Sequence, residues 1–513
     1  MIVRVAGRAI VADPRLAWRA ARVEAMNTPR GLKAWLAVLS VLVFIGAIGA
    51  VRSIFPGDKG TATTPTFEWG LLIAGYVFFA VTTSGLCLAS SLGTVFGIER
   101  FRPLEKRHAI LAVLCLVTAF GVIALDLHYP VRMVLGAAFN PSPTSPMWWM
   151  GVFYGIYLCF LLVEVWSMFW GHPRIHGMAC VLASAMAIIA PTTLGAVFAV
   201  VSARPYWAGA FTPLLMLATA FVSGTALLGV VFGMVDRLHL TGFERAGALA
   251  IPAIRSLLTL AIVIVACLVA REVVVGLAST DPGLSTAARA LVVGPLAVPF
   301  VGVRVVIGLV LPMALLVMPF TRTALGLFGA GCLTIVGVFA DRLTFVSAGQ
   351  IAPLTATSGV VSAPYAAYTP SLVEISILVG AAALIALVYT LAERYLDLRE
   401  SDVHVGFALP VSLGSWWRGR SVPAVSGSVP AGSPPAAEPL DSEPVVVEPA
   451  ASRADPEPPP VAAEDPAQTF ESSPAGPVTT EMSYVDEPDQ DELPSEAPPE
   501  EPLSSGSLPG GEP

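Results

Sequence analysis

Long apolar runs recur from residue 34 to residue 391, most of them about 17 to 25 residues long, with short polar connections between them. A helix of about 20 apolar residues crosses a hydrocarbon core about 30 Å thick. Hydrophobic residues make up 55% of the 513 residues and charged residues only 13%, against about 25% charged residues in soluble domains. The pattern predicts an all-α integral membrane protein, a bundle of about ten transmembrane helices.

The apolar runs also give the approximate bounds of the spans. The expected spans are Ala34–Ala50, Trp69–Leu92, Ala109–Leu125, Trp148–Trp170, Met178–Val201, Thr212–Val235, Ala248–Ala270, Leu291–Met318, Ala324–Ala340 and Ser371–Leu391. The eighth span contains Pro295, Pro299 and Pro312. Because proline removes a backbone donor and clashes with the preceding turn, this span should be kinked or locally broken.

Basic residues mark one side of the membrane. Segment 1–33 carries seven Lys and Arg against two acids, and connections 99–107 and 236–245 are the other basic ones. If ten spans are counted, all three segments lie on the same side of the membrane. Loops on the cytoplasmic side are enriched in Lys and Arg. We therefore expect a multi-pass protein of the cell inner (cytoplasmic) membrane with both termini in the cytoplasm. The larger connections on the opposite side are 126–147, 271–290 and 341–370.

The C-terminal part has a different composition. From Ser421 to the end, Pro, Glu, Asp, Ser, Ala and Gly dominate, with 19 acidic residues and one basic residue, Arg453. Such a segment buries too little apolar area to offset its chain entropy and stays disordered. The predicted organisation is a basic cytoplasmic segment (1–33), a transmembrane domain (34–400) and a disordered acidic Pro-rich tail (401–513).

Four ionisable residues lie within or at the ends of the expected spans. Asp126 ends the third span, Glu164 lies within the fourth, Arg304 lies in the middle of the eighth, and Glu374 opens the tenth. Charges at membrane depth are costly and are functional candidates. They could form a proton route joined to a redox or substrate site, with Arg304 keeping a carboxylate ionised. The alternative is a structural Arg–Glu pair, or for Asp126 a cap before Pro130.

The histidines and cysteines argue against a redox centre in this chain. All six histidines fall in expected loops or at span ends, whereas a haem between helices needs imidazoles that face each other from helix interiors. The six cysteines lie singly in apolar runs with no CxxC, and iron–sulfur clusters need clustered thiolates. We expect no haem, iron–sulfur cluster or metal site, so electrons would pass to or from another subunit. Nothing predicts a nucleic-acid partner.

Tryptophans gather near the span ends, as in an interfacial aromatic belt that contacts membrane lipid. They include Trp69, Trp148, Trp149, Trp166, Trp170 and Trp207. A second interpretation stays open for Trp148, Trp149 and Tyr129, which could line an apolar pocket for a quinone ring.

Several short motifs follow one another in order along about residues 30–400. They are Trp69-Gly70-Leu71, Leu125-Asp126-Leu127-His128-Tyr129-Pro130 with Arg132, Asn140-Pro141, Ser145-Pro146-Met147, Arg204-Pro205-Tyr206-Trp207, Gly308 to Pro312, Arg342, Gly349-Gln350, and Tyr368-Thr369-Pro370-Ser371-Leu372 with Glu374. Each motif is short, but the ordered set resembles the NrfD-like family, the membrane subunits of polysulfide reductases. The resemblance is closest to the ten-span branch found in hydrogenase and sulfur-metabolism complexes.

The resemblance implies a membrane subunit that lacks a redox cofactor of its own and binds menaquinone or ubiquinone. Family members exchange electrons with a ferredoxin-like iron–sulfur subunit, behind which lies a molybdopterin enzyme, a hydrogenase or a multihaem cytochrome. The family's quinone site lies near the docking side, where Asp126, His128, Tyr129 and connection 341–370 are expected. One difference from the family pattern is at residue 304. Relatives would have an acidic residue four positions before the glycine of the eighth span, and this chain has Arg304 before Gly308.

Together these features suggest a quinone-reactive membrane anchor subunit of a respiratory oxidoreductase. Because quinol oxidation releases protons with electrons, we expect Asp126 and His128 to exchange protons with the ring. Glu164 would be a deeper relay, with Arg304 as its electrostatic partner. The residues expected to contact the quinone are Tyr129, Gln350 and Trp148. Two alternatives remain: a secondary transporter, which also uses kinked helices and sparse buried charges, and a purely structural membrane anchor.

Overall fold

The structure, a computed structural model, describes residues 30–54, 61–65, 67–127, 139–237, 244–352, 365–366, 368–396 and 398. Its elements are α2 (Arg30–Ile54), α3 (Leu71–Thr94), η1 (Glu99–Leu104), α4 (Glu105–Asp126), α6 (Pro146–Trp170), α7 (Pro173–Ala199), α8 (Phe211–Arg237), α9 (Glu244–Ala278), α10 (Pro282–Val292), η2 (Val298–Val310), α11 (Leu311–Val317), η3 (Pro319–Thr321), α12 (Ala324–Ile351) and α13 (Leu372–Tyr395). Within these ranges, ten helical segments are long and apolar enough to cross a membrane, which confirms the predicted bundle. Most of the basic N-terminal segment and the whole acidic tail lie outside the described residues.

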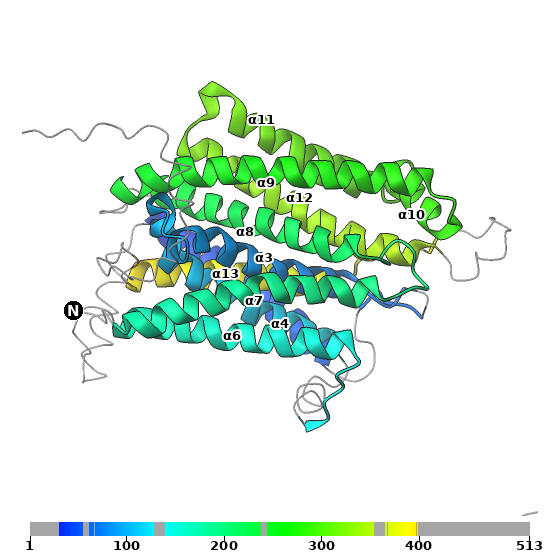
Figure 1. Ribbon diagram of the computed structural model, residues 1–513, viewed down its shortest axis with the longest axis horizontal. Helices are drawn as coiled ribbons and strands as arrows, with labels where there is room; N and C mark the ends of the chain where they lie inside the picture. The colour runs from blue at the N-terminus through cyan, green and yellow to red at the C-terminus, as the bar shows by residue number, and fades with distance from the viewer. Residues whose placement is uncertain are drawn as a thin grey trace, which may run out of the picture. The chain divides into compact units, whose positions relative to one another are not determined.

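The long helices run alongside one another (Figure 1). Helix α3 is the most enclosed, and it contacts α4, α7, α8 and α12. Helix α2 lies at the edge, against α13, and exposes most of its apolar side chains, as a lipid-facing helix does. We name the two ends of the bundle after residues there. The Trp207 end is where α4, α7, α9 and α12 finish, and the Glu105 end is where α4, α7 and α12 begin.

Local sequence signals define several helix ends. Ser145 and Thr323 cap α6 and α12, each accepting a hydrogen bond from a backbone N–H in the first turn. Ser371 and Glu374 form a reciprocal capping box at the start of α13. Gly171 ends α6 with a φ of 74°, a left-handed conformation that glycine adopts at little cost.

Helices α3 and α8 approach each other closely at two glycines. A Cβ atom on Gly85 would lie 1.7 Å from the carbonyl oxygen of Ala220, and one on Gly224 would lie 2.0 Å from the carbonyl carbon of Gly85. No side chain fits at either position. Small residues at such crossings let membrane helices gain packing contacts where lipid provides no hydrophobic driving force.

Two spans are longer than the sequence predicted. Helix α9 continues to Ala278 and α12 to Ile351, 8 and 11 residues past their expected ends. The predicted starts of the connections 271–290 and 341–370 are therefore wrong, because the pair of charged residues at each start lies within a helix. The helices continue because charges in both segments are neutralised inside the bundle, as described below.

The expected eighth span is broken near its start, as its prolines predicted, and its helix then continues without a break from Val298 to Val317. Helix α10 ends at Val292, a π-helical segment, η2, runs from Val298 to Val310, and α11 follows to Val317. Pro299 lies at the start of η2 and Pro312 at the start of α11, where a missing backbone donor is tolerated.

Candidate functional site

Four charged side chains from three elements meet inside the bundle, and we call them the arginine cluster: Glu272 of α9, Arg304 of η2, and Asp341 and Arg342 of α12. Their side chains are between 0% and 8% exposed. Arg304 Nη2 lies 2.9 Å from Glu272 Oε2 and 2.6 Å from Asp341 Oδ1. Arg342 Nη1 lies 3.3 Å from Asp341 Oδ2. Two cations and two carboxylates thus balance, which makes burial of the four charges tolerable.

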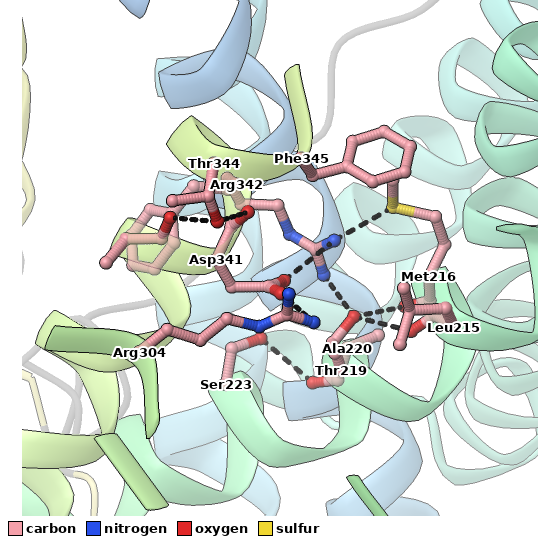
Figure 2. Close-up of polar contacts among 12 residues, drawn as sticks. Leu215, Met216, Thr219, Ala220, Ser223, Arg304, Asp341, Arg342, Thr344 and Phe345 are labelled. Atoms are coloured by element: carbon pink, nitrogen blue, oxygen red, sulfur yellow. Dashed lines mark hydrogen bonds and ion pairs between the residues drawn. The ribbon is translucent and has the colours of Figure 1, made fainter. Parts of the chain in front are cut away.

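The arginine cluster lies at membrane depth toward the Trp207 end. Glu272 precedes the end of α9 by six residues and Asp341 precedes the end of α12 by ten, so they lie about 9 and 15 Å from those ends at 1.5 Å per residue. Figure 2 shows Arg304 reaching the Asp341–Arg342 pair beside Thr219 and Met216 of α8. Arg342 donates to Thr219 Oγ1, and its Nη1 lies 3.0 Å from Met216 Sδ.

The position of Arg304 depends on the close contact between η2 and α12. A Cβ atom on Gly308 would lie 2.4 Å from the Cα atom of Gly337, so the two backbones touch one turn from the ion pairs. The segment that carries Arg304 is π-helical over 13 residues. Such segments are rare and occur mostly near functional sites. The sequence thus places an arginine on an unusual backbone at the centre of a charged cluster.

Tyr206 connects the arginine cluster to its surroundings. It lies in the connection between α7 and α8, and its hydroxyl donates a hydrogen bond to Glu272 Oε1. Burial, reinforced by the neighbouring Glu272 carboxylate, raises the pKa of Tyr206 well above its usual value. The phenol therefore keeps its proton and acts as a donor at ordinary pH.

Five rings pack together beside the arginine cluster, and we call them the aromatic group: Trp69, Phe198, Tyr206, Trp207 and Phe345. The Trp69 and Trp207 rings stack with centroids 5.0 Å apart, and Phe198 packs edge-on against both. Phe345 contacts Phe198 and Tyr206, and its carbonyl oxygen accepts a 2.9 Å hydrogen bond from Trp207 Nε1. Tyr206 belongs to both sets, so packed aromatic rings adjoin buried protonatable groups.

A second buried polar set lies toward the Glu105 end, and we call it the imidazole cluster: Glu105, His108, Glu164 and His176. His108 Nε2 lies 3.2 Å from Glu164 Oε1, with both side chains almost fully buried. His176 Nε2 lies 2.5 Å from Glu105 Oε1. Ser167 is placed between the two pairs, with its Oγ 3.5 Å from His176 Nδ1. In the part of the chain that the structure describes, no three His, Cys, Asp or Glu side chains come close enough to hold a metal ion.

The expected pairing of Glu164 with Arg304 is wrong. Glu164 pairs with His108, and Arg304 pairs with Glu272 and Asp341. The sequence expectation failed because residue spacing gives depth within one helix but not which faces of different helices meet. His108 and His176 are each the fourth residue of their helix, α4 and α7, so both lie near helix ends, and both side chains are buried there.

Asp126 is the last residue of α4 and is half-buried. It lies within electrostatic range of Tyr368, whose hydroxyl lies 3.0 Å from Glu374 Oε1. Burial and the Glu374 carboxylate raise the pKa of Tyr368, and Asp126 adds a smaller effect in the same direction. His128 and Tyr129, the other residues expected here, lie outside the described residues.

Gln350 and Trp148, expected to contact a quinone, have different surroundings. Gln350 accepts a 3.0 Å hydrogen bond from the Trp69 backbone N–H and donates one of 2.9 Å to the Trp69 carbonyl oxygen. Both ends of its amide are occupied, so Gln350 fixes Trp69 in the aromatic group. Trp148 is half-buried at the start of α6 and packs edge-on against Trp149 with centroids 4.7 Å apart.

Sequence reasoning missed Glu272 and Asp341, as well as the roles of Arg342 and Tyr206. One signal was available: each of the two acids adjoins an arginine at the edge of an apolar run, at 271–272 and 341–342. Adjacent opposite charges can continue a membrane helix where partners are available, so such a pair does not by itself mark a span end.

Comparison with known proteins agrees with this architecture. A family model described as polysulphide reductase, NrfD, matches residues 60–353, more than half of the chain. A selenate reductase subunit of Mesobacillus selenatarsenatis is 24% identical over 419 residues, which cover 72% of this chain and 96% of that protein. The Hdr-like menaquinol oxidoreductase integral membrane subunit of Archaeoglobus fulgidus is 22% identical over 379 residues, which cover 71% and 93%. The chain is therefore a multi-pass membrane protein that belongs to the NrfD polysulphide reductase family.

Proposed function

We propose that this chain is a quinone- or quinol-reactive membrane subunit of an oxidoreductase complex, with its reaction site at the Trp207 end. The observation that carries the proposal is the position of Tyr206. Its ring belongs to the aromatic group, and its hydroxyl donates to Glu272 of the arginine cluster. A ligand lying against these rings would therefore also lie close to groups that hold protons.

The chemistry of quinones fits both sets of residues. Oxidation of a quinol gives up two protons with two electrons, and reduction of a quinone takes them up. A group beside the ring must therefore accept or supply protons. Arg304 and Arg342 cannot lose their protons under ordinary conditions, so in the arginine cluster proton exchange would involve Glu272 and Asp341. Their charges are compensated by the arginines, which keeps them available as acceptors.

The residues first expected at this site keep their place in the proposal. Asp126 and His128 would exchange protons with the ring on the side of Tyr368, and Tyr129 and Trp148 would contact the ring. Gln350 would act indirectly, since its amide fixes the Trp69 backbone. Trp69 is only partly buried, and an aromatic ring favours offset stacking of a flat ring such as menaquinone or ubiquinone.

The names of the relatives support a multi-subunit assembly, since both are named as subunits of reductases or oxidoreductases. We propose that a ferredoxin-like iron–sulfur subunit docks at the Trp207 end and exchanges electrons with the quinone. Behind it would lie a catalytic subunit, such as a molybdopterin enzyme, a hydrogenase or a multihaem cytochrome. The basic connections support a location in the cell inner membrane with the Glu105 end and both termini in the cytoplasm, which is part of this proposal. Segments 1–33 and 401–513 would flank the membrane domain, 34–400.

Quinol oxidation by the purified complex tests the proposal. Asp341→Asn and Asp126→Asn should each lower the rate of quinol oxidation about 100-fold or more, since positioned acid–base groups contribute on this scale. Glu393→Gln is the matched control, because Glu393 forms a buried 2.6 Å ion pair with Arg107 away from the arginine cluster. Assembly of the complex is checked by size-exclusion chromatography. Normal turnover in both aspartate variants would contradict the proposal.

A secondary transporter remains the second candidate, because the eighth span changes from a π-helix to an α-helix and carries the buried Arg304 at membrane depth. Purification separates the possibilities. Isolation with an iron–sulfur subunit and extractable quinone supports the proposed function. Isolation as a lone chain that moves a solute into liposomes supports the transporter, and isolation with partners but without quinone supports a structural anchor.

A further inference from the structure

Helix α6 buries a narrow stripe that is mostly polar. Its buried residues are Tyr154, Tyr157, Leu161, Glu164 and Ser167. They are spaced three or four apart and so share one face of the helix. Four of these five side chains are polar, although the rest of α6 is half-buried or exposed and apolar. An inward polar stripe on a membrane helix is expensive, so it indicates a function for the buried groups.

At the Glu105 end of this stripe lies the imidazole cluster, which has unused hydrogen-bonding capacity. Glu164 Oε2 and His108 Nδ1 are buried and make no hydrogen bond of full geometry with the described residues, and thiols are among their polar neighbours. The titratable groups that face this pair come from four helices: Cys87 of α3, Glu105 of α4, Tyr157 of α6, and His176 and Cys180 of α7. None of these groups carries the permanent charge of an arginine.

The stripe then continues toward the arginine cluster through hydroxyl groups. The Tyr157 hydroxyl donates a 3.3 Å hydrogen bond to the Thr83 carbonyl oxygen. The Tyr154 hydroxyl and the Ser84 Oγ are buried next to each other, and neither makes a hydrogen bond of full geometry with the described residues. Tyr154 lies within electrostatic range of Arg342. Ten residues separate Tyr154 from Glu164, about 15 Å along the helix.

We propose that the imidazole cluster is a proton-binding site open to the Glu105 end, and that Tyr157 and Tyr154 connect it with the arginine cluster. A proton that enters at the Glu105–His176 pair would pass to the Glu164–His108 pair. From there it would move along the hydroxyls to the carboxylate of Asp341. Each step moves one proton between lone pairs on oxygen or nitrogen, and no electrons are exchanged.

Ordered water is the ligand that the unpartnered atoms would bind. Buried water molecules typically make about three hydrogen bonds to otherwise unsatisfied polar groups. The orphaned atoms of Glu164, His108, Tyr154 and Ser84 offer such partners along the route. Water would also carry the proton past Leu161, the one apolar residue in the stripe. The binding site itself does not depend on the proposed quinone reaction.

The site is tested first without turnover. Infrared difference spectra of the purified complex, recorded between about pH 5 and pH 9 where imidazoles titrate, should contain carboxyl and imidazole bands. The carboxyl band should be lost in Glu164→Gln and the imidazole band in His108→Asn, whereas Glu393→Gln should keep both. A wild-type spectrum in which neither Glu164 nor His108 changes protonation overturns the binding site.

The connecting route is tested during turnover in liposomes with a pH-sensitive dye on the Glu105 side. When the complex turns over in the direction of quinone reduction, which consumes protons at the ring, the wild type should take up protons from that side, and Tyr154→Phe should slow the uptake about tenfold or more. Tyr389→Phe is the matched control, since this buried hydroxyl contacts Glu393 and lies outside the stripe. Unchanged uptake in Tyr154→Phe overturns the route, whereas loss of electron transfer in the wild type would instead count against the quinone site.

Discussion

The arginine cluster and the imidazole cluster both bury four ionisable groups, but they hold charge by different means. Arg304 and Arg342 keep their protons at any ordinary pH, so Glu272 and Asp341 must stay beside them to balance the charge. In the imidazole cluster, the cations are histidines, which can become neutral. The first set is therefore held by two permanent cations, whereas in the second set the cations themselves can gain and lose protons.

The difference shows that depth of burial alone does not predict the role of a charge in the membrane. Arg304 and Glu164 are equally hidden, at 3% and 1% exposed. Removing Arg304 leaves its carboxylate partners with uncompensated charge. Removing the charge of Glu164 does not have this effect, because the histidine beside it can release its proton. Substitutions in the two clusters should thus have very different effects on stability.

Arg304→Met should have the largest effect. It leaves Glu272 and Asp341 buried with Arg342 as the remaining cation of the cluster, and breaking a buried pair in this way costs about 3–5 kcal/mol. Thermal unfolding of the purified protein in detergent measures the loss. Arg271→Met is the control, because Arg271 is exposed and its guanidinium lies over the Phe211 ring, a contact that contributes about 1 kcal/mol. Equal losses of stability in the two variants would mean that the buried ion pairs of the arginine cluster do not depend on Arg304.

Gly308→Ala should weaken the ion pairs of the arginine cluster by moving the backbone. The new Cβ atom would lie 2.4 Å from Gly337 Cα, so η2 and α12 must separate and the ion pairs of Arg304 must lengthen. Overpacking of this kind costs about 1–3 kcal/mol. Gly302→Ala is a matched control on the same π-helical segment, since no atom lies within 4 Å of the added Cβ. A stability loss in Gly302→Ala as large as in Gly308→Ala would show that the effect comes from the helix and not from the contact.

The sequence predicted the ten spans and the interrupted eighth span, because hydrophobicity and proline act locally along the chain. It did not predict the partners of Arg304 and Glu164, because these depend on which helix faces meet. The ends of α9 and α12 were misplaced for the same reason. The charged residues at 271–272 and 341–342 look like span ends until the partner Arg304 is known. The spacing of polar residues from Tyr154 to Ser167 could be recognised in the sequence, because it lies within a single helix.

Tyr206→Phe should have a moderate effect on the arginine cluster. It removes the hydroxyl that donates to Glu272, and a hydrogen bond to a charged group contributes about 1.5 kcal/mol. Because the folded pKa of Tyr206 is raised, this contribution is present up to about pH 10, the usual tyrosine pKa. It is lost only as the pH rises through the higher folded pKa. Unfolding measured from neutral to alkaline pH tests this, with the exposed Tyr365→Phe as control. A difference that vanishes well below pH 10 would contradict the assigned hydrogen bond.

Glu164→Gln should have the smallest effect, although Glu164 is as buried as Arg304. The amide oxygen can still accept a hydrogen bond from His108, and the imidazole becomes neutral without leaving a buried charge. We expect a change of less than about 1 kcal/mol in the free energy of unfolding, the size of one neutral hydrogen bond. The double variant Glu164→Gln with His108→Asn should show little coupling between the two changes in a thermodynamic cycle. A loss of unfolding free energy as large as that in Arg304→Met would mean that Glu164 and His108 form a permanent ion pair. The distinction between the permanent cations of the arginine cluster and the exchangeable ones of the imidazole cluster would then no longer hold.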